Sequence, residues 1–483
     1  MQSWKLSLLI HVYLVHIYRK NIPPEPLTNA NRDIVFKMDN ISHITQGSLD
    51  KSIFRLALPA MVTMVTIMLF EFIDLFWIGS LGPEAVAALG AASFVVWTLK
   101  SLANCVAAGL NALVSRNAGS RNFDRMQMWA SQGLILTILF TFLLAFLTYI
   151  ANLFLFQFLG LEPTVAQNAH EYTHIMTLGL VFIFLTISLE NIFRAAGNTF
   201  IPMIIIVFSL VMNAILDPFF IFGWYGFPEM GMAGGALASV ISHIIGYIIL
   251  FTQLPRIKIK FKIIMENFAR HSLEILKIGT PIGLLGGAFS IIYIVLSKNI
   301  AYFGTEPMAT ISICHRIEGI PFFICLGFST AVAALVGQNL GANNPERAER
   351  ATNRTLIYAS IFLLTISILF ILYGRSLLNF FIDDKAVVAE GYRYLFAISV
   401  FEVFLGPEII LEGAFTGAGD TKPPFLISIP LTLLRVPAAY FFSITLDYGV
   451  SAVWWVISAT TMMKGVMFFI WFRRGNWKHK KIG

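Results

Sequence analysis

The sequence predicts an all-α membrane protein in which twelve transmembrane helices form two pseudo-symmetric six-helix lobes around a central cleft. The composition supports the membrane assignment, because 57% of the 483 residues are hydrophobic and 13% are charged, whereas soluble domains carry about 25% charged residues. The apolar runs are continuous rather than alternating, which favours helices over strands as the spanning elements. An internal repeat predicts the division into two lobes.

Twelve apolar segments reach the length of about 20 residues that a helix needs to cross a bilayer. Their expected cores are 53–78, 85–113, 128–157, 164–189, 197–222, 233–254, 275–300, 307–336, 353–374, 386–411, 420–445 and 449–472. The spans divide the chain into an N-terminal tail (1–50), an N-lobe (51–254), a linker (255–274), a C-lobe (275–472) and a basic tail (473–483). The N-terminal tail is expected to be loose, and Met38 is an alternative start of translation.

Basic residues gather in alternate loops between the spans, above all in the RIKIKFK sequence at 256–262. Because loops rich in Lys and Arg stay on the cytoplasmic side, both termini and the linker are predicted to be cytoplasmic, in a multi-pass protein of the inner or plasma membrane. The linker is expected to lie on the anionic lipids of the inner leaflet. This distribution explains the formal net charge of +7 without a nucleic-acid partner.

The two halves of the chain repeat each other at a constant shift of 222 residues. ALVSRNAGSRN at 112–122 falls on ALVGQNLGANN at 334–344, and FRAAGNTFIP at 193–202 falls on FTGAGDTKPP at 415–424. Other pairs at this shift are Glu190 with Glu412 and Tyr172 with Tyr394. Six spans is an even number, so the repeats have the same orientation, which is typical of transporters with two lobes around a central substrate site.

Asp74 is a candidate functional residue because it lies within the first span, near its far end. A carboxylate inside a membrane costs about 2.5–3.5 kcal/mol on insertion scales, so such residues are usually functional. Glu71 lies three residues earlier. It is expected either to support Asp74, to face the cleft, or to close the outer mouth.

The paired loops and the FIDLFWIGSLG end of the first span resemble the multidrug and toxic compound extrusion (MATE) transporters. The resemblance covers roughly residues 50–470. It implies an antiporter that exports organic, often cationic, drugs or metabolites as its small-molecule substrates in exchange for Na⁺ or H⁺. Helix 7 (275–300) contains no acid, which favours the members whose ion site lies in the N-lobe.

The resemblance also implies which residues bind the coupling cation or proton. An Asp on helix 1 and an Asn and Asp on helix 5 match Asp74, Asn213 and Asp217, a hydroxyl on helix 6 matches Ser239, and a hinge proline matches Pro59. Asn213 and Asp217 are four apart and share one helical face. Two carboxylates in a low dielectric either take up a proton or share a cation, and amide and hydroxyl oxygens suit Na⁺. For Asp217, capping a kink at Pro218 is the structural alternative.

Other charged residues inside the spans are candidates for the cleft or a gate, or are structural ion pairs. Glu190 is four residues from Arg194, a spacing that predicts a pair. Arg435 is expected to pair with Glu408 or Glu402. The further candidates are Arg316 and Glu412.

No Walker loop, metal cluster or nucleophile motif is recognisable in the sequence, so neither an enzyme nor an ATP-driven pump is expected. We expect no cofactor beyond the coupling ion, no bound metal beyond a possible Na⁺ at the N-lobe acids, and a monomer. The alternative function is a flippase or exporter of a lipid-linked or other anionic substrate. Such a protein would line its cleft with cations, for which Arg316, Arg435 and Lys100 are the deep candidates.

Overall fold

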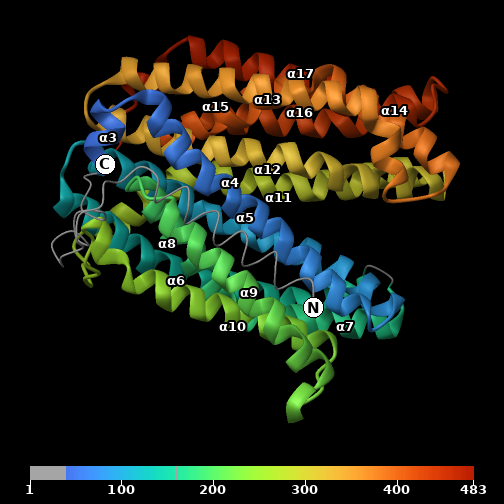
Figure 1. The fold of residues 1–483 in the computed structure, drawn as a ribbon. Helices are drawn as coiled ribbons and strands as arrows, with labels where there is room; N and C mark the ends of the chain where they lie inside the picture. The colour runs from blue at the N-terminus through green and yellow to red at the C-terminus, as the bar shows by residue number, and fades with distance from the viewer. Residues whose placement is uncertain (1–39, 159–160, 483) are drawn as a thin grey trace, which may run out of the picture. The chain divides into compact units, whose positions relative to one another are not determined.

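The computed structural model describes residues 40–158 and 161–482 (Figure 1), and the prediction for residues 1–39 lies outside this part of the chain. Its α-helices are α3 (Asn40–Gln46), α4 (Leu49–Gly79), α5 (Pro83–Gly119), α6 (Phe123–Phe158), α7 (Pro163–Leu178), α8 (Leu180–Ala195), α9 (Phe200–Phe222), α10 (Met232–Thr252), α11 (Phe268–Ala301), α12 (Thr305–Gly341), α13 (Pro345–Asn379), α14 (Lys385–Phe401), α15 (Leu405–Ala418), α16 (Lys422–Tyr440) and α17 (Ser451–Arg473). Short turns follow at η1 (Trp224–Gly226), η2 (Leu254–Ile257), η3 (Glu402–Phe404), η4 (Phe441–Thr445) and η5 (Asn476–His479). The described residues contain no strand.

Eleven helical segments of the described chain are long and apolar enough to cross a membrane, and the bent pair α7–α8 makes a twelfth. This confirms the twelve predicted spans. The fourth span differs from the prediction because it is broken by 56° at Gly179. A Cβ atom at Gly179 would lie 2.4 Å from Val240 of α10, so glycine permits the close approach of α10 at the bend.

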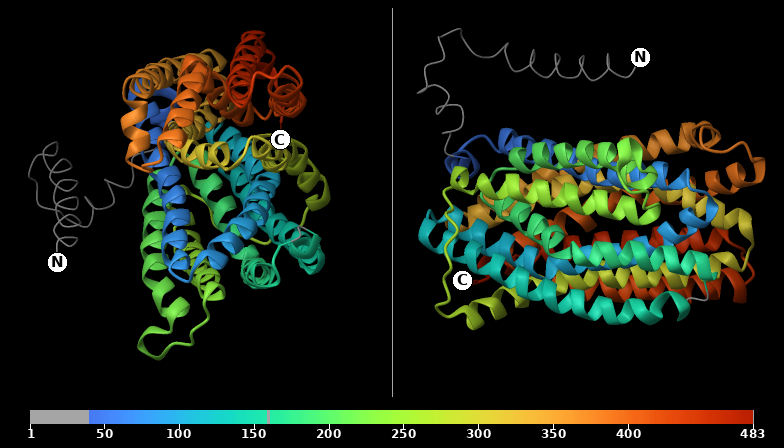
Figure 2. Two further views of the ribbon diagram at one scale, coloured as in Figure 1. Left: turned by 90° about the vertical axis from the view of Figure 1, so that its right-hand side faces the viewer. Right: turned by 90° about the horizontal axis from the view of Figure 1, so that it is seen from below.

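The helices form two bundles, α4–α10 and α11–α17, which are the two lobes. In the end-on view the first, blue to green, and the second, yellow to red, lie largely in separate groups (Figure 2). The lobes interlock at one end. Ile53, at the start of α4, packs into the core of the C-lobe, and Ile275, at the start of α11, packs into the core of the N-lobe. The two residues are equivalent at the shift of 222, so this exchange follows the repeat.

This interlocked end carries the basic loops, so we call it the basic end: it comprises the segments around residues 116–125, 254–277, 341–350 and 473–482. Glycines bring the lobes into backbone contact there. A Cβ atom at Gly119 would lie 1.9 Å from the carbonyl oxygen of Gln338, and one at Gly341 would lie 2.0 Å from that of Arg116. These contacts are related by the repeat.

Two predicted boundaries at the basic end differ from the structure. Residues 40–50 were assigned to a loose tail, but they comprise α3, a short bend at 47–48 and the start of α4. The segment is docked, because Arg347 of α13 donates hydrogen bonds to the carbonyl oxygens of Ile44 and Gly47. Helix α11 begins at Phe268, so it takes up residues that were assigned to the linker. Hydropathy located the apolar cores, whereas these segments are held by contacts with distant residues.

Candidate cation site

Side chains from α4, α7, α9 and α10 come together inside the N-lobe: Asp74, Tyr172, Asn213, Asp217 and Ser239. The Asn213 Nδ2 atom donates to Asp217 Oδ1 over 3.1 Å and to Ser239 Oγ over 3.2 Å. The Tyr172 hydroxyl donates to Asp74 Oδ2 over 3.5 Å. Asn213 also lies near the Asp74 carboxyl group. Its amide group therefore lies between the two carboxyl groups.

The α9 and α10 helices can hold these groups close together because α10 presents glycines to α9. A Cβ atom at Gly234 would lie 2.3 Å from the carbonyl oxygen of Phe220, and one at Gly246 would lie 2.5 Å from Ser209 Oγ. Real Cβ atoms essentially never come this close, so a side chain at Gly234 would displace the α9 backbone and one at Gly246 would displace the Ser209 side chain. The small residues of the GGALAS segment thus position Ser239 against α9.

Three oxygen atoms of this cluster have no hydrogen-bond partner among the described residues: Asp74 Oδ1, Asn213 Oδ1 and Asp217 Oδ2. Asn213 and Asp217 are completely buried. Leaving buried polar atoms unpaired is costly, so each such atom calls for an explanation. Carboxylate and amide oxygens are hard ligands that suit a small hard cation, and a carboxylate can equally take up a proton. The donor set therefore fits Na⁺ or H⁺.

Glu71 and Lys100 lie beside this cluster. The Lys100 ammonium group, on α5, acts electrostatically on the carboxyl groups of Glu71 and Asp74. Glu71 is exposed and lies near Trp97 of α5. The negative charge of Glu71 also acts electrostatically on the Asp74 carboxyl group. The predicted acids thus share their surroundings with one cation from the neighbouring helix.

Pro59 and Glu190 lie elsewhere in the N-lobe. Pro59 is inside α4, which continues unbroken through it, so its role as a hinge stays a prediction. Glu190 Oε2 accepts a hydrogen bond from Arg194 over 2.7 Å, and both side chains are buried, which confirms the predicted pair. The C-lobe equivalent of this pair has no arginine, because Thr416 follows Glu412 at the same spacing.

The C-lobe pairs its charges differently from the prediction. Arg435 bonds to neither Glu408 nor Glu402. Its guanidinium group instead donates to Thr460, Thr461, the Tyr293 hydroxyl and a backbone carbonyl. Glu408 pairs with Lys464 over 2.9 Å.

Sequence reasoning had not considered Lys464, which is 2% exposed and also acts electrostatically on Glu412. The Arg435 guanidinium group donates to hydroxyl groups because Thr460 and Thr461 lie opposite it on α17. Arg316 is exposed and lies 5.8 Å from the centre of the Phe72 ring on α4. This contact brings a C-lobe cation against the N-lobe.

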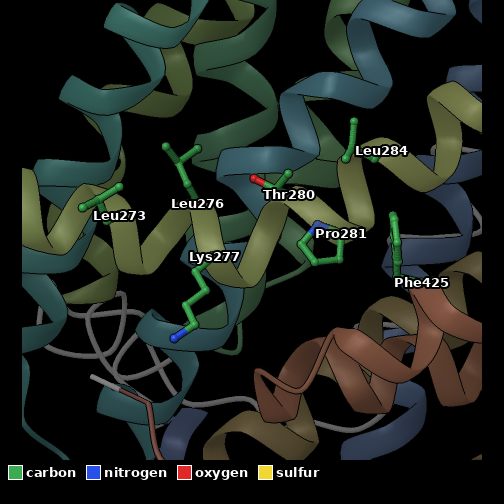
Figure 3. Close-up of a pocket in the computed structure, with 7 residues that line it drawn as sticks. All are labelled: Leu273, Leu276, Lys277, Thr280, Pro281, Leu284 and Phe425. Carbon is green, nitrogen blue, oxygen red and sulfur yellow. The ribbon is translucent and has the colours of Figure 1, made fainter.

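A separate groove of about 440 Å³ lies between α11 and α16 (Figure 3). It is lined by Lys277, Thr280, Pro281 and Phe425, with leucines of α11. None of the candidate site residues lines it. We therefore do not assign transport function to this groove.

Tyr172 is a site residue that sequence reasoning missed. It was noted only as the repeat equivalent of Tyr394. That equivalence was the available signal, because both tyrosines prove to donate a hydrogen bond to a carboxyl group in the membrane: Tyr394 to Glu318 and Tyr172 to Asp74.

Comparisons with known proteins agree with this architecture. The MatE family model matches the chain twice, over residues 59–219 and 281–441. Both boundaries of the second match lie 222 residues after those of the first, which is the shift of the predicted repeat.

Curated relatives match almost the whole chain. A probable multidrug resistance protein NorM from Thermotoga maritima is 26% identical over 89% of this chain and 94% of its own length. An FAD transporter from Shewanella oneidensis is 25% identical over 88% of this chain and 94% of its own length.

Solved structures show the same fold. A MOP superfamily transporter from Pyrococcus furiosus has a TM-score of 0.84 at 24% identity, covering 92% of this chain and 99% of that chain. An outward-facing structure of a multidrug resistance MATE family transporter has a TM-score of 0.83 at 24% identity, with the same coverage.

Proposed function

The chain belongs to the MatE family of membrane transporters, and we propose that it is a secondary active antiporter that exports organic, often cationic, drugs or metabolites in exchange for Na⁺ or H⁺. The observation that carries the proposal is the group of unpartnered buried oxygens of Asp74, Asn213 and Asp217. The relatives named as multidrug resistance proteins support efflux of this substrate class.

In this proposal the N-lobe cluster binds the coupling ion, and its charge changes when the ion leaves. Asp74 and Asp217 provide the negative charge, while Asn213 and Ser239 provide neutral oxygens. Tyr172 orients Asp74 through its hydroxyl group. Because Asp74 lies on α4 and Asp217 lies on α9, an ion held by both carboxyl groups fixes the two helices relative to each other.

The experiment is export of ethidium, a fluorescent organic cation, by the purified protein in proteoliposomes. A Na⁺ gradient and a H⁺ gradient are imposed separately, which also identifies the coupling ion. We expect Asp74→Asn and Asp217→Asn to abolish gradient-driven movement, because an amide can neither bind a proton nor supply the negative charge.

Asp124→Asn is the matched control, because Asp124 is exposed at the start of α6, far from the cluster in sequence. It should transport normally. Gradient-driven export that persists in both Asp74→Asn and Asp217→Asn would contradict the proposed site. Folding of each variant is checked by its thermal unfolding in detergent.

A second candidate function is export of an anionic substrate. Arg316 lies against Phe72 between the lobes, and Lys100 lies beside Glu71, so cations are present near the proposed ion site. The relative named as an FAD transporter favours this alternative. FAD and ethidium should therefore be compared as substrates. Faster export of FAD, lost in Arg316→Gln, would select the second candidate.

A further inference from the structure

The groove between α11 and α16 lies where a helix of the C-lobe crosses to the N-lobe (Figure 3). The first half of α11 packs closely against α5 of the N-lobe. A Cβ atom at Gly279 would lie 2.1 Å from the carbonyl oxygen of Cys105, and one at Gly283 would lie 2.3 Å from the Cys105 sulfur. Another side of α11 is left beside α16, and the groove of about 440 Å³ opens between these two helices.

The wall of the groove is mainly apolar. Leu276, Thr280 and Leu284 follow one another at intervals of four residues, so they lie on one face of α11. Pro281 lies beside them, and Phe425 provides the α16 side. Leu284 is 43% exposed although it lies in a membrane-spanning helix. Because lipid tails are as apolar as leucine, such a groove is suited to an acyl chain.

A lysine lies at the start of the apolar part of each of the two helices. Lys277 lines the groove and is the last charged residue before the uncharged run 278–297. Lys422, the first residue of α16, likewise precedes the uncharged run 423–434. A lysine at the end of an apolar run extends its ammonium group to the membrane surface. Both lysines are therefore at the level of the lipid headgroups.

A hydrogen bond between the two helices brings these lysines to the same place. The Thr421 hydroxyl donates to the carbonyl oxygen of Ile278 over 2.7 Å. Lys422 and Lys277 are the direct chain neighbours of these two residues. Both lysines are exposed, and neither forms an ion pair within the described part of the chain. Two unpaired ammonium groups attract a phosphate group, which accepts charge-assisted hydrogen bonds.

Pro281 adds an acceptor to this end of the groove. A proline has no N–H group, so the carbonyl oxygen of Lys277, four residues earlier, lacks its usual helical donor. Both residues line the groove. This oxygen can accept a hydrogen bond from a headgroup hydroxyl, which the glycerol of phosphatidylglycerol provides.

We propose that the groove between α11 and α16 binds an anionic glycerophospholipid, with its phosphate group held by Lys277 and Lys422 and an acyl chain along the apolar wall. Leu284 is seven residues beyond Lys277, which places it about 10 Å along α11 from the phosphate position. The lipid fills the space that the crossing of α11 leaves beside α16. The site does not depend on the proposed antiport, because none of the cation-site residues lines the groove.

The test is native mass spectrometry of the full-length, delipidated protein with equal amounts of phosphatidylglycerol and phosphatidylcholine that carry the same acyl chains. The parent protein should retain phosphatidylglycerol in preference. A lysine near a membrane surface strengthens the binding of an anionic lipid about five-fold, so Lys277→Gln combined with Lys422→Gln should reduce this preference by about 25-fold. Lys298→Gln is the matched control, because Lys298 is exposed at the other end of α11. It should keep the preference of the parent.

Leu284→Trp tests the acyl chain separately, because it keeps both lysines and fills the groove with an indole ring. It should retain less phosphatidylglycerol than the parent. Glycerol 3-phosphate, which carries the phosphate group without acyl chains, should not displace the lipid. The substituted residues are all exposed, so the variants should fold, which is checked by thermal unfolding in detergent.

An unchanged preference in the double lysine variant, or unchanged retention of phosphatidylglycerol by Leu284→Trp, would overturn the proposal. Displacement of the lipid by glycerol 3-phosphate would also overturn it, since the site would then bind a free phosphate compound. Transport is not measured in this experiment, so its outcome is separate from that of the ethidium assay.

Discussion

Replacing Gly119 by alanine should separate the two lobes at the basic end. Gly119 ends α5 of the N-lobe, and its Cα lies against the backbone of Gln338 in the C-lobe. An added Cβ atom would lie 1.9 Å from the Gln338 carbonyl oxygen, whereas real Cβ atoms do not come closer than 3.0 Å. The helices therefore have to move apart by about 1 Å or more.

The size of the effect follows from the kind of contact. Overpacking a tightly packed site costs about 1–3 kcal/mol. Alanine also favours a helix over glycine by about 0.5–1 kcal/mol, but this gain is the same in any conformation that keeps α5 helical. The equilibrium between this structure and one with the basic end open should therefore shift by about 5- to 150-fold toward the open form.

The assay is the distance between spin labels at Asp124→Cys and Glu346→Cys, measured by double electron–electron resonance. Both residues are exposed, at the starts of α6 and α13, and they are equivalent at the shift of 222. Gly119→Ala should add a population with a longer distance.

Gly90→Ala is the control, because Gly90 is on the same helix and a Cβ atom there meets nothing within 4 Å. It should keep the distance distribution of the parent protein. Identical distributions for Gly119→Ala and Gly90→Ala would refute the view that these backbone contacts hold the basic end closed. Gly341→Ala, at the equivalent position, should reproduce the effect of Gly119→Ala.

Lys464→Met should lower the free energy of unfolding by about 3–5 kcal/mol, because it leaves the Glu408 carboxylate unpaired in the lobe. Adding Glu408→Gln should restore much of the thermal stability, and a Lys464→Met protein as stable as the parent would contradict this. Arg347→Ala removes two hydrogen bonds to carbonyl groups of residues 44–47, each worth about 1.5–3 kcal/mol, so amide exchange there should accelerate; unchanged protection would speak against the docking of α3. A single cysteine replacing Lys260 should resist an impermeant maleimide added to intact cells, and rapid labelling would place the linker outside.

Much of the fold could be predicted because hydropathy and the repeat can both be read directly from the sequence. Twelve apolar runs and one constant shift were enough for the spans and the two lobes. The break at Gly179 was not predictable, because it depends on Val240 of another span. The docking of residues 40–50 depends likewise on Arg347, some 300 positions away in the chain.

Some residues of the candidate site could likewise be predicted from the sequence, and others could not. Asn213 and Asp217 could be grouped from their helical spacing alone, and the structure places them in contact. Their assignment as an ion site stays a prediction. Tyr172 and Lys464 were missed because the role of a tyrosine or lysine in an apolar run depends on the carboxyl group that lies opposite it. That partner lies on a different helix, so no local pattern reveals it.

The repeat has different consequences for the backbone and for the charges. The glycines at the basic end and the tyrosines opposite the carboxyl groups occur at equivalent positions in both lobes, because one fold requires them twice. The acids occur at non-equivalent positions, since Asp74 comes from the first helix of its lobe and Glu318 from the second. A tyrosine hydroxyl can donate a hydrogen bond to whichever carboxyl group lies opposite it. The repeat therefore fixes the position of the tyrosine in each lobe, whereas the helix that supplies the carboxyl group differs between the lobes.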